Sequence, residues 1–424
     1  MNHDKILQKL KTPKWNIAIA LLAHCLSFYD FAVFGLLSSV IGDLFFPKQD
    51  ELASLISGFG VFTVAYISRP LGGIVFGYIG DKLGRKKSYI VALMLMVVPT
   101  ICIGSLPTFS QVGIIAPILL ISLRLIQGVA LAGTFSGNVL YIIERSPKGH
   151  RGLVSGLGQG AIGISYILGS VVTSMSLFFL SKEEFYSWGW RIPFLFGAVT
   201  GLIAFLCKYV LQETQPFLEL VETGNLSPNP LLEAAKTVKV KALILMGISL
   251  VGVAGVYTVL VFYPGYLTKL GGLSFLQIAI ITLIIGTIRV IVSPLSGWLF
   301  DRSGEKLTLL FLSAAAIAVL APIVAYHVTH GVFWKSATAI ACLGILVGIY
   351  QGPLSALQVA LFPTRVRSTG LLTAQNLSNS LIGGTTPFIA ALLIHQTGST
   401  LAPAFYLSAI AVISLITLCF YKAS

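Results

Sequence analysis

The sequence predicts an all-α integral membrane protein with twelve transmembrane helices in two six-helix repeats. The 424 residues are 56% hydrophobic and 10% charged, and the mean hydropathy is +0.90. This composition is typical of a polytopic membrane protein. Apolar stretches long enough to cross a bilayer recur along the chain, and one unusual stretch occurs twice. Composition therefore sets the class, and the repeat sets the division into halves.

The apolar stretches define the expected domains. The longest hydrophilic loop follows the sixth stretch, so we expect an N-terminal bundle at 1–211, a cytoplasmic linker at 212–240 and a C-terminal bundle at 241–424. The expected spans are about 16–41, 53–79, 88–106, 112–143, 153–180, 191–211, 241–263, 276–300, 306–327, 332–357, 368–394 and 401–421.

Loop charges predict the orientation. Twenty of the 28 Lys and Arg residues fall on the side of the N-terminus, five on the other side, and three inside spans. Because cytoplasmic loops carry the excess of positive charge, we expect both termini in the cytoplasm. The same rule accounts for the net charge of +13. No nucleic-acid-binding motif accompanies this charge, so nucleic acid is not an expected partner.

The repeated stretch runs from Arg69 to Lys87 and returns around Asp301. Its glycines at 73, 77, 80 and 84 would share one face of a helix and allow close approach of a neighbour. Two similar halves of this kind are common in transporters. The matched positions are Arg69 with Arg289, Gly77 with Gly297, and Asp81 with Asp301.

Four charged residues fall inside predicted spans: Asp30, Arg69, Arg124 and Arg289. Such groups usually face a cavity or a partner. Asp30 could bind the coupling proton, or it could form a permanent pair with Arg124 or Arg69. Arg124 and Arg289 could grip an anionic group in bidentate fashion, or they could hold helices together. His24 is a further titratable group, for which we expect a packed, neutral state.

Polar residues in the spans complete the predicted substrate site. Any one of them could instead form a hydrogen bond between helices. The predicted substrate-binding residues are Arg124, Arg289, Tyr29, Gln127, Gln159, Tyr257 and Asn376, and further candidates for the cavity wall are Tyr166, Gln351 and Asn379.

The motifs of enzymes are missing. The sequence has no Gly-x-Ser-x-Gly, no His-Glu-x-x-His and no P-loop. Its five cysteines lie far apart in apolar segments without a Cys-x-x-Cys motif. We therefore predict that the protein is not an enzyme and has no cofactor and no metal site.

Several stretches resemble a known family. Arg69–Lys87 is similar to the loop 2–3 signature of the major facilitator superfamily. More narrowly, the sequence resembles the metabolite:proton symporter family, which includes proline/betaine, α-ketoglutarate, citrate and shikimate carriers. The stretches that carry this resemblance are Phe28–Phe31, Arg69–Gly73, Arg124–Gly128, Trp188–Phe194, Glu213–Phe217 and Leu361–Arg367.

The resemblance implies the major facilitator fold, alternating access and transport driven by the proton gradient. It also implies a conformational latch of Asp81, Arg85 and Glu144, and a multi-pass location in a bacterial inner membrane. We expect a monomer in the lipid bilayer. The sequence departs from the family at Thr134, where members usually carry a glutamate. Proton coupling should then depend on Asp30, depend on His24, or be absent.

Arg124, Arg289 and Asp30, together with the resemblance, predict proton-coupled symport of a small organic anion, a mono-, di- or polycarboxylate. Three alternatives stay open: import or export of a larger polycarboxylate such as a siderophore, transport of a zwitterion such as proline or betaine, and a non-transporting receptor on a transporter fold.

Overall fold

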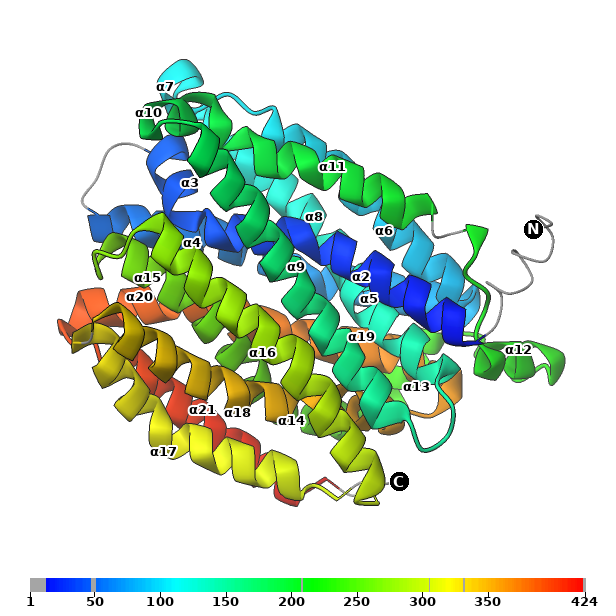
Figure 1. Ribbon diagram of the computed structural model, residues 1–424. Helices are drawn as coiled ribbons and strands as arrows, with labels where there is room; N and C mark the ends of the chain where they lie inside the picture. The colour runs from blue at the N-terminus through cyan, green and yellow to red at the C-terminus, as the bar shows by residue number, and fades with distance from the viewer. Residues whose placement is uncertain (1–12, 47–50, 207–208, 305, 331, 422–424) are drawn as a thin grey trace, which may run out of the picture.

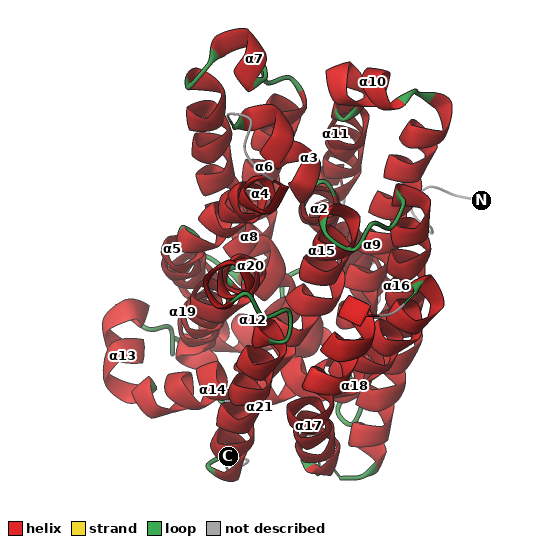
Figure 2. Ribbon diagram, turned by 90° about the vertical axis from the view of Figure 1, so that its left-hand side faces the viewer, coloured by secondary structure: helices red, strands yellow, loops and turns green. Residues whose placement is uncertain are grey.

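The computed structural model describes residues 13–46, 51–206, 209–304, 306–330 and 332–421. All regular elements of these residues are helices (Figure 2). Eleven helical segments are long and apolar enough to cross a membrane. The shorter apolar helix α11 (Arg191–Leu206) lies at the sixth predicted span. The predicted all-α fold with twelve spans is confirmed.

Eight spans are continuous helices, and four are broken or contain a wider turn. The continuous ones are α6 (Arg85–Gly104), α8 (Ile115–Arg145), α9 (Arg151–Phe179), α11, α16 (Phe275–Arg302), α17 (Thr308–His330), α18 (Phe333–Ala360) and α21 (Ala402–Cys419). The first span consists of α2 (Pro13–Leu36) and α3 (Ser38–Phe45), and the second of α4 (Glu51–Ile67) and α5 (Arg69–Lys82). The seventh consists of α14 (Lys239–Tyr257), η3 (Thr258–Phe262) and α15 (Tyr263–Lys269). The eleventh consists of η4 (Thr364–Val366), α19 (Arg367–Ser378), η5 (Asn379–Gly383) and α20 (Thr386–Thr397). Short helices in the connections are α7 (Phe109–Val112), α10 (Lys182–Glu184), η1 (Phe185–Gly189), α12 (Gln215–Glu222) and α13 (Pro230–Thr237).

The two halves of the chain pack side by side. In Figure 1 the blue-to-green helices form one layer and the yellow-to-red helices the other. The halves meet extensively along two helix pairs, α9 with α16 and α5 with α19. Since α5 and α16 carry the two copies of the repeated stretch, the repeat lies at the interface between the halves.

The predicted glycine face lies at this interface. Gly73 and Gly77 of α5 face the backbone of α19, and a β-carbon at Gly77 would lie 2.8 Å from the Cα of Thr369. Gly297 of α16 meets the backbone of Gly152 on α9 in the same way. The prediction was wrong for Gly84, which precedes α6 with φ of +108° instead of extending the helical face. A glycine suits this turn because positive φ is unfavourable for other residues.

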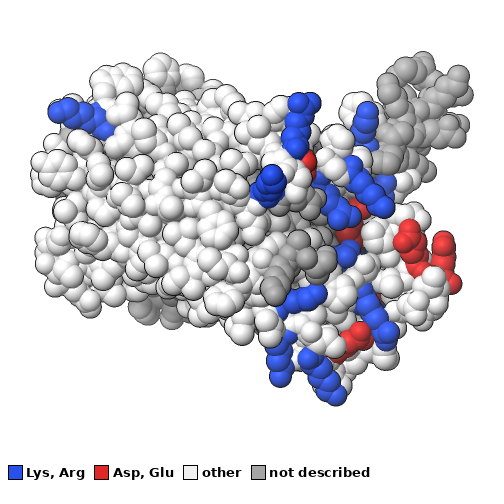
Figure 3. Space-filling model, turned by 90° about the horizontal axis from the view of Figure 1, so that it is seen from below, with Lys and Arg blue, Asp and Glu red and all other residues white. Residues whose placement is uncertain are grey.

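Charged side chains gather at one end of the molecule, the end where α12 and α13 lie (Figure 3). The opposite end of the same face is almost free of them. This is the asymmetry that the loop charges predict, and it marks the charged end as the one that we expect in the cytoplasm.

Candidate functional site

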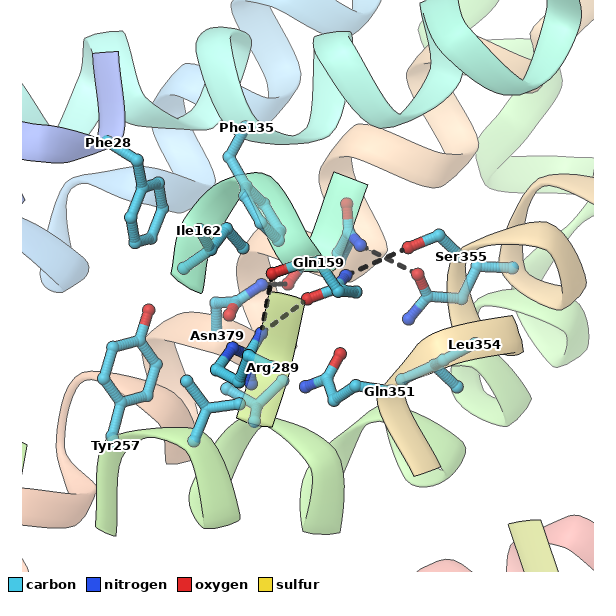
Figure 4. A pocket seen from close by; sticks show the side chains of 14 residues that line it. Phe28, Phe135, Gln159, Ile162, Tyr257, Arg289, Gln351, Leu354, Ser355 and Asn379 are labelled. Carbon is cyan, nitrogen blue, oxygen red and sulfur yellow. Dashed lines mark hydrogen bonds between the residues drawn. The ribbon is translucent and has the colours of Figure 1, made fainter. Parts of the chain in front are cut away.

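A cavity lies between the two halves, with a volume of about 30 Å³ (Figure 4). Both halves contribute to its wall. Its aromatic lining is Phe28, Phe135 and Tyr257, and its polar lining is Gln159, Arg289, Gln351, Ser355, Gln358, Gln375 and Asn379. Gln159, Tyr257 and Arg289 of the predicted substrate-binding set therefore lie together on this wall.

Two lining residues stand at wider turns of their helices. Tyr257 ends α14 where the π-helical turn η3 begins, and Asn379 begins the π-helical turn η5. The Asn379 amide donates back to the Gln375 carbonyl at 2.7 Å. Such turns are rare and frequently lie at functional sites, because they re-aim side chains out of the helical register.

Arg289 of α16 supplies the positive charge of the cavity wall. Its side chain is 2% exposed. Nη2 donates to the side-chain oxygen of Gln159 at 3.0 Å and to the Gln159 carbonyl at 3.5 Å, while Nε has no hydrogen-bond acceptor among the described residues. Among the described residues Arg289 forms no ion pair. The wall thus holds a guanidinium whose charge no carboxylate of the described chain neutralises.

Arg69 repeats this arrangement in the other half. Its Nε donates to the Asn376 side-chain oxygen at 2.8 Å, and its guanidinium lies 5.0 Å from the ring centre of Tyr66 and 5.4 Å from that of Phe135. Each repeat-related arginine therefore binds an amide of the opposite half. Asn376 holds Arg69 and is not part of the cavity lining.

Arg124 belongs to a separate cluster inside the N-terminal half. It lies 3.5 Å from Asp30, and Gln127 bridges the two by accepting from Arg124 at 2.6 Å and donating to Asp30 at 2.7 Å. Gln127 also donates to Thr100 at 3.0 Å. The structure places this cluster outside the cavity lining and brings Asp30 next to Arg124.

Three further residues of the sequence analysis also lie away from the lining. The Tyr29 hydroxyl donates to the Pro193 carbonyl of α11 at 2.9 Å. Thr134 donates to the Leu131 carbonyl of its own helix at 3.3 Å. His24 is buried, and its ring lies 5.7 Å from that of Phe135. We therefore leave these residues out of the proposed substrate contacts.

Two aspartates join the halves at the charged end. Asp81 accepts from the backbone N–H groups of Ser368 and Thr369 at 3.1 and 2.7 Å. Its repeat-related partner Asp301 accepts from the N–H groups of Gly152 and Leu153 at 2.8 Å each. Each carboxylate thus lies at the N-terminal end of a helix in the other half, where the helix dipole favours negative charge.

The predicted latch residues Asp81, Arg85 and Glu144 lie together at this end. Arg85 is 2.8 Å from Asp81 and 3.5 Å from Glu144. Glu144 is 3.0 Å from Arg367 of the C-terminal half. Glu213 of the linker accepts from the N–H of Arg85 at 3.1 Å. Burial raises the pKa of the Glu213 carboxyl. Burial therefore disfavours the ionised carboxylate, although that is the form that accepts hydrogen bonds at the start of α6.

The opposite end is also closed. Lys269 of α15 is 2.7 Å from Asp43 of α3, and Thr63 donates to the Gly384 carbonyl at 2.8 Å. Deeper in the bundle, the Tyr66 hydroxyl donates to that of Tyr257 at 2.5 Å. The halves therefore touch above and below the cavity, which is the arrangement of an occluded state.

Comparisons with known proteins agree with this architecture. The family model described as Major Facilitator Superfamily matches residues 20–387. The chain belongs to the major facilitator superfamily. A crystal structure of the proton:xylose symporter XylE superposes with a TM-score of 0.77 at 17% identity, over 96% of this chain and 95% of that one. This likeness shows the major facilitator fold.

Relatives by sequence lie within the same superfamily. The glycine betaine/proline/ectoine/pipecolic acid transporter OusA of Dickeya dadantii is 32% identical over 96% of this chain and 82% of its own length. The proline/betaine transporter of Escherichia coli K12 is 31% identical over 95% of this chain and 82% of its own length. The protein is therefore a secondary transporter of this superfamily and not an enzyme, and the predicted family resemblance is confirmed.

Sequence reasoning missed two aromatic residues near the cavity, Phe135 and Tyr66. Phe135 lines the cavity and lies under the Arg69 guanidinium. Tyr66 precedes Arg69 by three positions, a spacing that places both on one side of a helix. This spacing could have indicated that Tyr66 lies near Arg69. Without it, an aromatic residue in a span is most simply interpreted as part of the apolar core.

Proposed function

We propose that this protein is a proton-coupled symporter of a small zwitterion that carries one carboxylate and one ammonium group, of the proline and betaine class. The main support for this proposal is the environment of Arg289. Arg289 is a buried guanidinium on the cavity wall without an ion pair among the described residues. The charge and the free Nε call for an acceptor that a substrate carboxylate would supply.

The carboxylate would replace the Gln159 amide as the partner of Arg289. A guanidinium binds a carboxylate through two parallel hydrogen bonds, whereas the amide offers a neutral oxygen at 3.0 Å. The exchange would free Gln159, which also donates to Ser355 at 3.3 Å across the interface. Substrate binding would thereby alter a contact between the two halves.

The aromatic lining suits the other end of a zwitterion. Phe28, Phe135 and Tyr257 face the cavity, and no acidic side chain is among its lining residues in the described chain. A quaternary or secondary ammonium is attracted by aromatic faces, and this attraction is strongest where water is excluded. Recognition by aromatic faces also requires no carboxylate, which would otherwise pair with Arg289.

The same features argue against a polycarboxylate, our expectation from the sequence. A second carboxylate would need a second cation on the wall. Arg124 is paired with Asp30, and Arg69 is held by Asn376 outside the lining. One accessible guanidinium matches one carboxylate, and the named substrates of both relatives above are zwitterions or include them.

We assign the coupling proton to Asp30. One of its oxygens accepts from Gln127, and the other is buried without a hydrogen-bond partner in the described part of the chain. Protonation there would release the charge of Arg124 and so alter packing inside the N-terminal half. Rocking of the halves would then open one end at a time, with Asp81, Arg85 and Glu144 as the latch of the cytoplasmic end.

Uptake by proteoliposomes tests this proposal. We expect labelled betaine or proline to accumulate with an imposed proton gradient and not after addition of an uncoupler. Arg289→Gln should weaken substrate binding roughly 10- to 100-fold, because a charge-assisted hydrogen bond contributes about 1.5–3 kcal/mol. Arg151→Gln, which removes an exposed arginine, should leave uptake unchanged.

Other outcomes would redirect the proposal. Accumulation of citrate or α-ketoglutarate in place of betaine would restore the organic-anion hypothesis. Uptake that persists with uncoupler would contradict the proton coupling. Saturable betaine binding without any flux would indicate a receptor that does not transport.

A further inference from the structure

Several buried hydrogen-bond donors lie around Tyr257. Five side chains from both halves gather there and keep their donors buried. Tyr166 and Gln159, seven positions apart on α9, lie on one side of that helix. The donor cluster consists of Arg69, Arg289, Tyr66, Tyr166 and Tyr257.

Three of the donors have no acceptor in the described protein. They are Nη2 of Arg69, Nε of Arg289 and the hydroxyl of Tyr166. A guanidinium offers five N–H groups and cannot accept. The amide oxygens that accept from the two arginines are those of Asn376 for Arg69 and Gln159 for Arg289. A buried donor without an acceptor is costly, so the cluster is suited to a ligand that only accepts hydrogen bonds.

The cluster also carries uncompensated positive charge. Arg69 and Arg289 are 1% and 2% exposed, and both act electrostatically on the Tyr257 hydroxyl. Neither forms an ion pair within the described residues. Water could satisfy the donors but not the charge. Because a buried charge is strongly unfavourable without a partner of opposite sign, the ligand that fits is an anion.

The size of the cavity restricts which anion fits in this occluded state. Its volume of about 30 Å³ has room for roughly two water-sized particles. An organic substrate needs a larger space, whereas a monatomic halide is close to water in size. We propose that the donor cluster binds a chloride ion when the organic substrate is absent, at the Arg289 side of Tyr257.

Chloride would compensate one of the two positive charges of the cluster during the return of the carrier without substrate. The inference that chloride binds depends only on the donor cluster. The further step, in which a substrate carboxylate displaces chloride from Arg289, rests on the proposed function. Chloride should then act as a competitor, raising the apparent Kd for substrate linearly with the chloride concentration.

Binding is tested on the purified full-length protein in lipid nanodiscs without organic substrate. We expect the apparent melting temperature to rise with chloride concentration, logarithmically above the Kd, at constant ionic strength made up with sodium methanesulfonate. We also expect the chloride-35 NMR line to broaden. Both effects should disappear in Arg289→Gln and persist in Arg151→Gln. Equal effects in all three proteins, or no chloride effect in the native protein, would overturn the proposal.

Tyr166→Phe provides a gentler variant, because it removes one unpartnered hydroxyl and leaves the ring in place. We expect it to fold like the native protein and to raise the chloride Kd roughly 2- to 10-fold. An unchanged Kd would exclude Tyr166 from the site and contradict the cluster as defined.

The two proposals fail separately. Loss of betaine uptake with intact, Arg289-dependent chloride binding would refute the proposed substrate and keep the halide site. Betaine uptake that is indifferent to chloride, together with no chloride binding, would refute the halide site alone.

Discussion

Arg124 and Arg289 are both buried arginines in membrane spans, but their surroundings differ. Arg124 has Asp30 at 3.5 Å, and its guanidinium lies 3.5 Å from the ring centre of Phe34. Arg289 has no carboxylate partner among the described residues and donates to the Gln159 side chain at 3.0 Å and to the Gln159 carbonyl at 3.5 Å. The first charge is neutralised inside one half, while the second lies on a cavity wall between the halves. Depth in the membrane therefore does not distinguish the two arginines, whereas the presence of a carboxylate partner does.

Removal of one member of the neutralised pair should have the largest effect. Arg124→Gln leaves Asp30 buried without its cation, which costs about 3–5 kcal/mol of folding free energy. We expect a strong loss of folded protein in size-exclusion chromatography and a lowered melting temperature. The double variant Asp30→Asn with Arg124→Gln should recover much of the loss. If Arg124→Gln alone were as stable as native protein, the pair would not be structural.

Gln159→Glu should convert Arg289 into a second neutralised arginine. The new carboxylate would stand where an oxygen now lies 3.0 Å from Nη2. We expect the fold to persist and the substrate Kd to rise roughly 10- to 100-fold, because the substrate would compete with a charged partner. Gln159→Met, which adds no charge, is the control. Similar losses in both variants would show that the amide itself binds substrate.

An ion pair at the molecular surface should matter least. Lys269 and Asp43 lie 2.7 Å apart, with side chains 15% and 28% exposed. Lys269→Gln should change the unfolding free energy by only about 0.2–1 kcal/mol. Melting curves at low and high salt would test this, since screening should weaken the native pair and not the variant. A loss as large as that of Arg124→Gln would contradict the role of burial in the comparison.

The sequence predicted the fold well because that prediction rests on patterns that packing does not alter. Hydropathy located the spans, and the repeat indicated the division into two halves. The site was harder. Which side of a helix faces the cavity depends on its tilt and rotation, which neighbouring helices set. The wider turns at Tyr257 and Asn379 change the register further. Tyr29 and Asp30 are adjacent in sequence but point in different directions around their helix. Tyr29 therefore contacts α11 and Asp30 contacts α8.

Asp81 and Asp301 have a consequence for how the chain folds. Each completes the hydrogen bonding of a helix start that belongs to the other half. The first N–H groups of a helix have no partner within the helix, so a half synthesised alone would leave them open at its inner surface. Although the halves are similar, they are interdependent folding units, and two separately expressed fragments would have a chemical reason to find each other.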